Sequence, residues 1–325
     1  MTNQTDIQLL EKLGEVKSQF FAEIGKSIIG QHKVLDHILI ALLSKGHTLI
    51  VGVPGLAKTL MIKSIADILD LNFKRIQFTP DLMPSDITGT EVIEEDQSTG
   101  KRSFRFFKGP IFGNIILADE INRTPPKTQA ALLEAMQEHK VTASGHTYDL
   151  EEPFFVLATQ NPIEQEGTYP LPEAQLDRFM FNVLIDYPDR EDEVSIVQST
   201  TANDSPSLKK IILKEDILSL QKLIRRIPIA ENVIEYAVDL VSSTRPGDSS
   251  KDFVNELIDW GAGPRASQYL VLGAKARAAL DGRHTPNIED IKALALPILR
   301  HRVLPNFNAE AEGLKVDDII LRLIS

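Results

Sequence analysis

Cysteine is absent from the 325-residue sequence. This absence excludes disulfide bonds, thiolate metal ligands and cysteine nucleophiles, and it is compatible with a reducing compartment. The sequence also lacks a run of about 18 apolar residues, so no segment is expected to span a membrane. The polar N-terminal segment 1–11 lacks the basic and apolar regions of a signal peptide. We therefore expect a cytoplasmic protein.

The sequence has fewer basic than acidic residues: 35 Lys and Arg residues and 46 Asp and Glu residues give a formal net charge of −11. A net negative protein binds polyanions poorly, so nucleic acid is not expected as the main ligand, although a local basic patch stays compatible with this charge. Hydrophobic residues make up 42% of the chain, which excludes collagen-like and disordered classes. The length favours two domains, each large enough to bury a core.

The first part of the chain contains short apolar runs that are typical of buried strands. Helical periodicity separates most of them, at Lys58–Leu69 and Pro126–His139, and further helices are expected at 7–28, with Gly14 as a candidate break, and at Gln31–Ser44. Strands that alternate with helices predict an α/β fold with a parallel sheet covered on both faces. The expected strands are His47–Val51, Phe73–Phe78, Asn114–Ala118, Phe154–Thr159 and Phe181–Ile185.

The second part of the chain is expected to be helical. The small polar stretch 198–207 is typical of a linker. Beyond it no clear strand run remains, and helical periodicity covers 215–242, 252–281 and 288–300, with Asp216 and Asn287 at candidate helix starts. The sequence thus predicts an α/β domain over 1–198 and a smaller all-α domain over 199–325.

A glycine-containing loop follows the first expected strand and reads G-V-P-G-L-A-K-T from Gly52 to Thr59. Such a loop before a helix turns its backbone N–H groups toward an anion. Lys58 would reach the β- and γ-phosphates of ATP, and Thr59 would hold Mg²⁺. Ala57 stands where the strict P-loop pattern has glycine, and we expect a negative φ there, since only a positive φ favours glycine. The alternative is a strand–turn–helix with an exposed lysine.

Two carboxylates end the apolar segment I-I-L-A-D-E at residues 115–120. Buried charges are costly unless they are paired or bound to a metal. Asp119 can bind Mg²⁺ directly or through water, and Glu120 can orient and polarise the water that attacks ATP. Taken alone, the pair is also compatible with a strand end that carries solvated acids.

Asn161 follows the fourth expected strand in the segment A-T-Q-N-P. Ligands of open α/β sheets bind at the carboxyl ends of the strands, so this amide could contact the γ-phosphate or the attacking water. The alternative is an Asn-Pro turn with no role in chemistry.

The order of P-loop, D-E strand and Asn, followed by a helical domain, resembles the AAA+ ATPases, and more narrowly the MoxR family. The matching segments span roughly residues 25 to 305, and Ala57 is usual within this family. Gly263 departs from the pattern, because the family often has Ser there. The segments that carry the resemblance are Gly52–Thr59, A-D-E-I-N-R at 118–123, N-P-I-E-Q-E-G-T-Y-P-L-P-E-A-Q-L-D-R-F at 161–179 and G-A-G-P-R-A at 261–266.

The resemblance implies roles for further residues. Segment 28–31 matches the adenine side of the site, Arg178 matches the arginine finger that reaches a neighbouring subunit's γ-phosphate, and Arg265 matches the second sensor on a helical lid, acting in cis or in trans. A guanidinium suits both roles, because it is always charged and grips phosphate oxygens in a fixed fork. The residues expected to contact the nucleotide are Ile29, Gly30, Gly52, Pro54, Gly55, Leu56, Ala57, Lys58, Thr59 and Leu60.

Each of these arginines also has a structural interpretation. Arg178 could form a surface ion pair with Asp177 or Glu173, and Arg265 could be a solvated residue at a helix N-terminus. Arg123 is a candidate for either an interface or a structural role.

Two further segments bear on the ligand. Lys140–Pro153 predicts a hairpin with Ser144-Gly145 at its tip, and it lacks the basic residues that grip DNA in relatives that are helicases. Asp86–Gly113 matches a family insertion that faces the central pore or a partner, and its acidic and basic run around 94–105 predicts a solvated loop or hairpin. We expect its Phe104, Phe106 and Phe107 to pack on the core rather than stack on bases.

The resemblance implies an enzyme that hydrolyses ATP with Mg²⁺ in the crevice between the α/β domain and the lid. It implies a hexameric ring and chaperone-like remodelling, assembly, or cofactor or metal insertion of client protein complexes. A separate protein with a von Willebrand factor A domain is the expected partner. The alternatives are a motor that acts on nucleic acid and a nucleotide-regulated scaffold without turnover.

Overall fold

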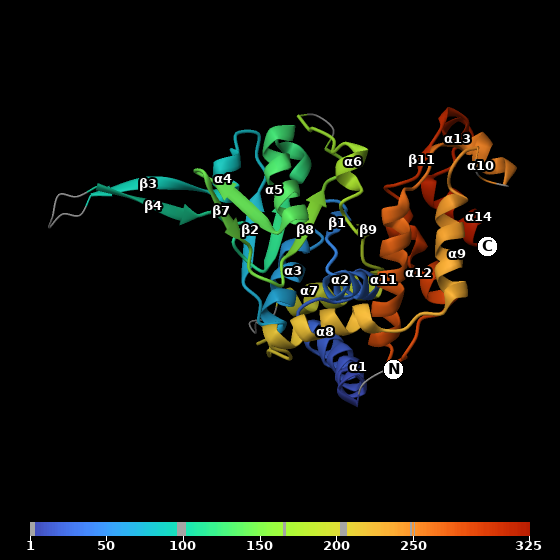
Figure 1. Cartoon of the computed structure of the whole chain (residues 1–325), viewed down its shortest axis with the longest axis horizontal. Coiled ribbons are helices and arrows are strands. Elements are labelled where there is room, and N and C mark those ends of the chain that lie inside the picture. The colour runs from blue at the N-terminus through green and yellow to red at the C-terminus, as the bar shows by residue number, and fades with distance from the viewer. Residues whose placement is uncertain (1–3, 96–101, 165–166, 202–206, 248, 250) are drawn as a thin grey trace.

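The computed structural model describes residues 4–95, 102–164, 167–201, 207–247, 249 and 251–325. Its centre is a five-stranded parallel sheet with the order β2-β5-β8-β1-β9 (Figure 1). Every expected strand is confirmed, to within a residue or so at each end. The strands are β1 (Thr48–Val51), β2 (Phe73–Gln77), β5 (Ile115–Asp119), β8 (Phe155–Gln160) and β9 (Phe181–Leu184).

Both faces of this sheet are covered, which explains why its inner strands β5 and β8 are largely apolar. Along β5, Ile115 and Leu117 belong to one buried cluster, whereas Ile116 and Ala118 belong to another on the opposite face. Successive side chains of a strand point to opposite faces, so a strand between two cores needs apolar residues throughout. The expected α/β fold is confirmed.

Each helix that we expected in the first part is present with one difference, and the described residues contain four further helical segments that we did not expect. α1 runs without a break through Gly14, where we expected a candidate break. A glycine costs a helix interior only about 0.5–1 kcal/mol, and the buried face of α1 outweighs this cost. The helices are α1 (Gln4–Ile24), α2 (His32–Leu43), α3 (Lys58–Ile68), α4 (Pro84–Thr88), η1 (Ile121–Arg123), α5 (Pro126–Glu138), α6 (Glu173–Leu176) and α7 (Arg190–Thr200).

Two hairpins accompany the sheet. β6 (Lys140–Ala143) and β7 (His146–Asp149) are joined through Ser144 and Gly145, both at positive φ, as a tight two-residue turn requires. β3 (Gly89–Glu95) and β4 (Arg102–Lys108) form a longer hairpin that projects from the sheet domain (Figure 1). Its tip, including Asp96 and Lys101, lies outside the described residues.

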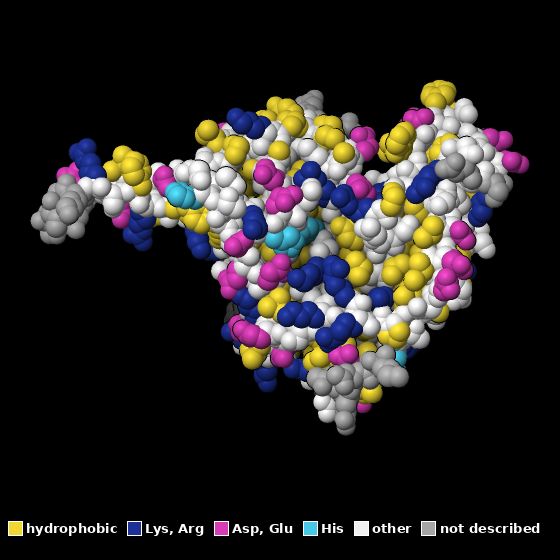
Figure 2. Space-filling view, in the orientation of Figure 1, with side chains coloured by type: hydrophobic (Ala, Val, Ile, Leu, Met, Phe, Trp, Pro, Cys, Tyr) yellow, Lys and Arg dark blue, Asp and Glu magenta, His cyan; other side chains and the backbone are white. Residues whose placement is uncertain are grey.

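The expected packing of the hairpin phenylalanines on the core is wrong for two of the three. Phe104 is 73% exposed and Phe107 is 45% exposed, because among the strands of the described residues β3 and β4 pair only with each other. Figure 2 shows hydrophobic side chains along this projecting hairpin. Phe106, near the base, stacks on the ring of Tyr148, with centroids 4.3 Å apart.

The second part is helical, with one correction. A two-stranded ribbon pairs β10 (Ile258–Trp260) with β11 (Leu304–Pro305), so this part is not entirely α. Strands of three and two residues are too short to leave a periodic pattern. The helices are α8 (Lys214–Arg226), α9 (Glu231–Ser242), α10 (Asp252–Leu257), α11 (Pro264–Leu280), α12 (Ile288–Leu299), α13 (Phe307–Ala311) and α14 (Val316–Ile324).

The helix starts and the linker are partly as expected. Asn287 caps α12 with a capping box, as expected, whereas α8 begins two residues before Asp216, which lies in its first turn. The expected linker 198–207 overlaps the end of α7, and its residues 202–206 lie outside the described residues. α1 packs against both α8 and α11, so one buried cluster continues from the sheet into the helical part. No helix in the described ranges has the length and apolarity needed to cross a bilayer.

Candidate active site

The strand order brings the expected motifs to one edge of the sheet. β1, β8 and β5 are parallel neighbours, so Gly52, Asn161 and the pair Asp119–Glu120 follow adjacent carboxyl ends. Backbone bonds hold the edge together: the Gly52 N–H donates to the Gln160 carbonyl at 3.2 Å. This is the edge at which open α/β sheets bind ligands.

The loop between β1 and α3 contains a strained residue. Ala57 has a φ of +52° and a ψ of 26°, so the expected negative φ is wrong. The left-handed conformation costs an alanine about 1–2 kcal/mol. The strain is tolerated because Ala57 opens α3, where its carbonyl accepts from the Met61 N–H at 2.9 Å and Met61, Ile62 and Ile65 are buried.

Lys58 folds back into this loop, where its Nζ donates to the Gly52 carbonyl. The lysine is half-buried, and burial lowers its pKa, while the carboxylates of Asp119 and Glu120 oppose that shift. The side chain is therefore not the freely exposed lysine of the alternative interpretation. Its charge lies within the field of both carboxylates.

Asp119 and Glu120 are paired and hydrogen-bonded rather than simply solvated. Asp119 accepts from the Thr159 hydroxyl at 2.7 Å and from Nη2 of Arg75 at 2.6 Å. Glu120 accepts from Nη1 of Arg123 at 2.9 Å and from Nε2 of Gln77 at 3.2 Å.

The local backbone conformation sets the direction of the Glu120 side chain. Glu120 sits at a φ of +57° directly after β5, and its N–H donates to the Thr159 hydroxyl at 2.8 Å.

Sequence reasoning missed the residues that hold the two carboxylates. Arg75 and Gln77 lie on β2, and Gln77 is in register with Asp119 on the neighbouring strand. Thr159 precedes Asn161 on β8 by two residues. The available signal is weak for Arg75 and Gln77, because β2 reads F-K-R-I-Q and is mostly polar, whereas Thr159 is a polar residue near the end of β8, which begins with four apolar residues. The pairing itself depends on which strands are neighbours.

Asn161 is 6% exposed, and its side-chain carbonyl accepts from the Ile163 N–H at 3.1 Å. The Asn-Pro turn of the alternative interpretation is thus present. It also fixes the side chain at the end of β8, next to the strand that carries Asp119. The turn and a ligand contact are compatible, since an amide offers donors in addition to that carbonyl.

A cavity of about 400 Å³ lies beside the loop. The expected adenine-side residues Ile28, Ile29 and Gln31 line it, together with Leu56 and other residues of the loop and α3. Its third wall is the segment around α7, from Tyr187 to Thr200, which sequence reasoning did not assign to the site. We had expected a crevice shared with the helical part. The residues that line this cavity instead all lie between 27 and 200, within the first part of the chain.

Gly30 brings the adenine-side segment close to α7. Its φ is +68°, and a Cβ built on it would lie 2.3 Å from Oδ2 of Asp192. Only glycine allows both this backbone conformation and this approach.

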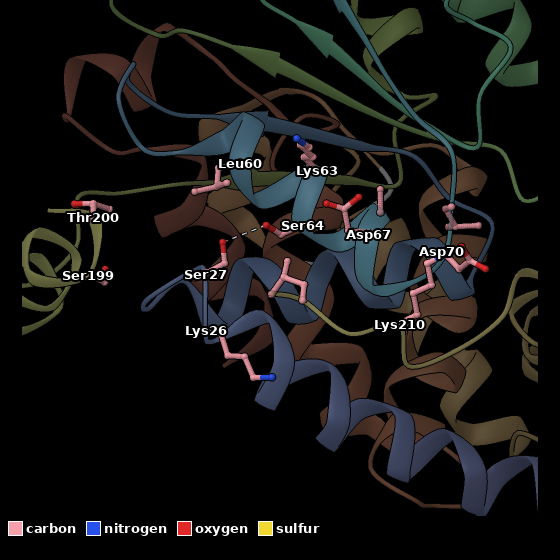
Figure 3. A pocket seen from close by; sticks show the side chains of 13 residues that line it. Lys26, Ser27, Leu60, Lys63, Ser64, Asp67, Asp70, Ser199, Thr200 and Lys210 are labelled. Carbon is pink, nitrogen blue, oxygen red and sulfur yellow. Dashed lines mark hydrogen bonds and ion pairs between the residues drawn. The ribbon is translucent and has the colours of Figure 1, made fainter. Parts of the chain in front are cut away.

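Figure 3 shows the residues that line a second, larger cavity of about 820 Å³. The two share Ser27, Leu60, Ser199 and Thr200 in their lining, and a Ser27–Ser64 hydrogen bond of 3.3 Å crosses it. Two of its lysines are already paired: Lys26 with Glu23, and Lys210 with Asp70. Two of the three lysines that line this cavity therefore already have a carboxylate partner within the fold.

The expected arginines lie together, away from the residues that line the two cavities beside the loop. Arg178 donates from Nη1 to the Leu133 carbonyl on α5 at 2.7 Å, and not to Asp177 or Glu173 as the alternative interpretation held. Arg265, in the first turn of α11, instead pairs with Asp177 at 2.9 Å.

Arg123 lies in the site itself, because it pairs with Glu120 at 2.9 Å. This contact was not anticipated from the sequence.

The residues at the sheet edge fit a magnesium nucleotide. No group of three or more His, Asp or Glu side chains among the described residues is arranged as a metal site built from protein alone. A hydroxyl at Thr59 and a carboxylate at Asp119 instead suit Mg²⁺, which keeps water and phosphate oxygens among its ligands. The apolar cavity beside the loop suits a flat base, and the loop at the N-terminus of α3 suits phosphates.

Two family models match the chain. The model of the ATPase family associated with various cellular activities (AAA) matches residues 47–181, which contain the loop, both carboxylates, Asn161 and Arg178. The model of the AAA lid domain matches residues 251–323, which contain Arg265.

Known proteins resemble nearly the whole chain. Chaperone MoxR1 of Mycobacterium tuberculosis is 40% identical over 93% of this chain and 79% of its own length. YeaC of Bacillus subtilis, an uncharacterized protein, is 41% identical over 97% of this chain and 95% of its own length. A crystal structure of a candidate ATPase from Cytophaga hutchinsonii is 44% identical, has a TM-score of 0.89, and matches over 97% of this chain and 96% of that one.

Proposed function

This chain belongs to the MoxR family of AAA+ ATPases, and we propose that it hydrolyses ATP to drive chaperone-like remodelling, assembly, or cofactor or metal insertion of client protein complexes. One observation carries the proposal of hydrolysis. The phosphate-type loop, the Asp119–Glu120 pair and Asn161 follow adjacent strands of one sheet edge.

Each residue at this edge has a distinct task. Lys58 and the loop N–H groups bind the phosphates, and the pocket beside α7 binds the adenine. Thr59 and Asp119 hold Mg²⁺, which neutralises charge on the phosphates. Glu120 orients and polarises the attacking water, and Asn161 contacts that water or the γ-phosphate. The Arg123 and Gln77 contacts to Glu120 hold the carboxylate in place until it acts.

We assign Arg178 to a neighbouring copy's site. Its guanidinium is bonded to α5, and Arg178 does not line the cavity of its own chain. An arginine finger in trans makes each site incomplete in an isolated chain, so a closed ring, in this superfamily a hexamer, is the active form. Arg265 pairs with Asp177, the residue that precedes Arg178. Because Arg265 thus lies beside Arg178, we propose that it also acts in trans.

The proposal also covers the domain boundaries, the partners and the subcellular location. We assign 1–198 to the nucleotide domain and 199–325 to the lid, and we place the protein in the cytoplasm with a separate von Willebrand factor A protein as partner. The name of the relative Chaperone MoxR1 supports the client role. The neutral tip at Ser144–Gly145 and the charge of −11 weigh against a nucleic-acid motor.

Glu120→Gln tests the proposed hydrolysis. The amide keeps the size of the side chain but loses the charge that polarises water, so the variant should bind ATP with Mg²⁺ and turn it over at least about 100-fold more slowly. The measurements are nucleotide binding by titration and phosphate release at saturating ATP. Turnover at the wild-type rate would remove Glu120 from this role.

Two outcomes would favour the alternatives. Undetectable turnover in an assembled ring of the wild-type chain would support a nucleotide-regulated scaffold. Stimulation of the ATPase by DNA would support a nucleic-acid motor. A von Willebrand factor A protein retained by the ATP-bound Glu120→Gln variant would support the proposed partner.

A further inference from the structure

Side chains of the helical part grip the segment 177–182, which carries Arg178 between α6 and β9. The backbone carbonyls of residues 177, 178, 179, 180 and 182 all accept hydrogen bonds from side chains on α11 or from residues 300–302. A loop usually satisfies its carbonyls with water or with its own backbone. Here a different part of the fold supplies the donors.

Arg302 is the centre of this grip. Its side chain is 2% exposed, and its Nη2 donates to the Asp177 carbonyl at 2.8 Å and the Phe179 carbonyl at 2.6 Å. Its Nε donates to the Asp177 carboxylate at 2.7 Å, and its Nη1 donates to the Met180 carbonyl at 3.3 Å. One guanidinium thus holds the backbone on both sides of Arg178.

Three neighbours extend the contact. The Tyr269 hydroxyl donates to the carbonyl of Arg178 itself at 3.3 Å. Nε2 of His301 lies 3.1 Å from the Phe179 carbonyl, and Nη1 of Arg300 donates to the Asn182 carbonyl at 2.8 Å. The Arg178 backbone is therefore fixed by the helical part, while its side chain is fixed by α5.

These contacts cannot be broken one at a time at low cost. A buried guanidinium that loses its partners is left as an uncompensated charge, and the carbonyls that it leaves lose their donors. If the helical part is displaced, the segment 177–182 must therefore move with it. Where the segment cannot move, these contacts oppose the displacement.

We propose that Arg302 is a positioning residue that couples the lid to the arginine finger, so that the placement of one subunit's lid sets the hydrolysis rate in the neighbouring subunit. The inference rests on the proposed role of Arg178 in trans. It also explains how a client or partner bound to the lid of one subunit would change ATP turnover in the neighbouring subunit. The lid would act on its neighbour's chemistry through the backbone around Arg178.

The test is complementation between variants in mixed rings. Arg302→Lys keeps the charge, but an ammonium cannot replace the fork that reaches several carbonyls. Rings of this variant should bind ATP with an unchanged KM and lose at least about tenfold in kcat, as expected when only the finger is misplaced.

The Glu120→Gln variant has the opposite defect, because it supplies an intact finger but has an inactive site of its own. In an equal mixture, about one quarter of the sites pair an intact Glu120 with an intact finger, if subunits mix at random. We therefore expect the mixture of Arg302→Lys and Glu120→Gln to recover roughly a quarter of the wild-type rate. The mixture of Arg302→Lys and Arg178→Ala should recover nothing, since every finger is defective.

The possible failures can be told apart. If Arg178→Ala regains activity with Glu120→Gln and Arg302→Lys does not, the coupling through Arg302 is wrong while the trans finger stands. If neither mixture regains activity, the trans finger fails and the inference falls with it.

Two further variants separate positioning from folding. Arg283→Lys alters a lid arginine that pairs with Asp290 inside the helical part and contacts no residue of 177–182, so it should leave kcat unchanged. Tyr269→Phe removes only the bond to the Arg178 carbonyl and should lower kcat several-fold at constant KM. If Arg302→Lys fails to fold, an unchanged kcat in Tyr269→Phe would overturn the inference.

Discussion

Single residues beside the cavity of about 400 Å³ and at the sheet edge carry unusual backbone conformations. Gly30, Gly55, Ala57 and Glu120 all have positive φ, between +52° and +87°. For residues other than glycine such a conformation is strained and persists only where the surroundings enforce it. In this chain it places the loop and the Glu120 carboxylate at the same edge of the sheet.

Gly30→Ala should weaken ATP binding. The alanine would have to adopt a positive φ, and its methyl group would meet the Asp192 carboxylate of α7, which would have to turn away. We expect the Kd for ATP to rise about tenfold or more and the unfolding free energy to fall by about 1–2 kcal/mol. Titration with a fluorescent nucleotide and urea unfolding measure the two effects.

Gly14→Ala is the matched control. Gly14 lies inside α1, and nothing lies within 4 Å of a Cβ placed there. The substitution should leave ATP binding unchanged and stabilise the chain by about 0.5–1 kcal/mol. Equal ATP affinities in the two variants would show that Gly30 has no part in the cavity.

On the scale of the elements, the β3–β4 hairpin stands out from the sheet domain (Figure 1). It projects from the sheet, and the exposed side chains along it include Ile93 and Phe104. Ion pairs cross it between Arg105 and Glu94 and between Arg102 and Glu95, all on the surface. Such pairs contribute little, so the hairpin depends on its base.

Phe106→Ala should therefore destabilise the hairpin base, whereas Phe104→Ser should not. Phe106 stacks on Tyr148 and lies 6.0 Å from the Phe112 ring, and an aromatic pair of this kind contributes about 0.5–1.5 kcal/mol. Phe104 is largely in water, so its loss should change the unfolding free energy by no more than about 0.5 kcal/mol. Urea unfolding of both variants checks this, and similar losses would contradict the hairpin's exposed placement.

On the scale of the whole molecule, the buried His47 and His301 and the partly buried His37 link stability to pH. Burial lowers the pKa of His47 to about 4, and the pKa of His37 likewise to about 4; it holds that of His301 well below its usual range. Nδ1 of His47 accepts from the Val156 N–H, a bond that protonation would break. The unfolded chain, with ordinary histidines, takes up protons more readily than the folded one.

The unfolding free energy should consequently fall as the pH drops from about 6.5 toward 4. The lowered pKa values mean that this stability is complete above the pKa of an unfolded histidine and is lost as the pH approaches that of the folded one. Each of His37 and His47 should account for roughly 2 kcal/mol between about pH 7 and pH 5. Denaturant unfolding at several pH values measures the slope.

His37→Leu should reduce this slope without a lost hydrogen bond. Within the described part of the chain, Nδ1 of His37 is buried and has no partner, and the ring packs near Phe181. An unchanged dependence on pH would mean that His37 is as easily protonated in the folded chain as in the unfolded one.

Local patterns along the chain were sufficient to predict the five sheet strands and most helices, and to place the loop, the Asp119–Glu120 pair and Asn161 at strand ends. The roles of these residues stay predictions. The predicted features depend on near neighbours in the sequence: period-2 or period-3.6 apolarity, capping residues, and a glycine loop between a strand and a helix. The sequence did not predict the short ribbon of β10 and β11 or the positive φ of Ala57, because neither feature leaves such a pattern.

Contacts between distant segments were decided by the tertiary structure alone. The sheet order puts Gln77 and Arg75 beside the Asp119–Glu120 pair, the turn after β9 makes α7 a wall of the cavity, and the packing of the helical part brings Arg302 onto the segment of Arg178. Such pairings join residues more than 40 positions apart in the sequence, in the last case 125. They follow from how whole faces are buried against one another, which no local run of residues records.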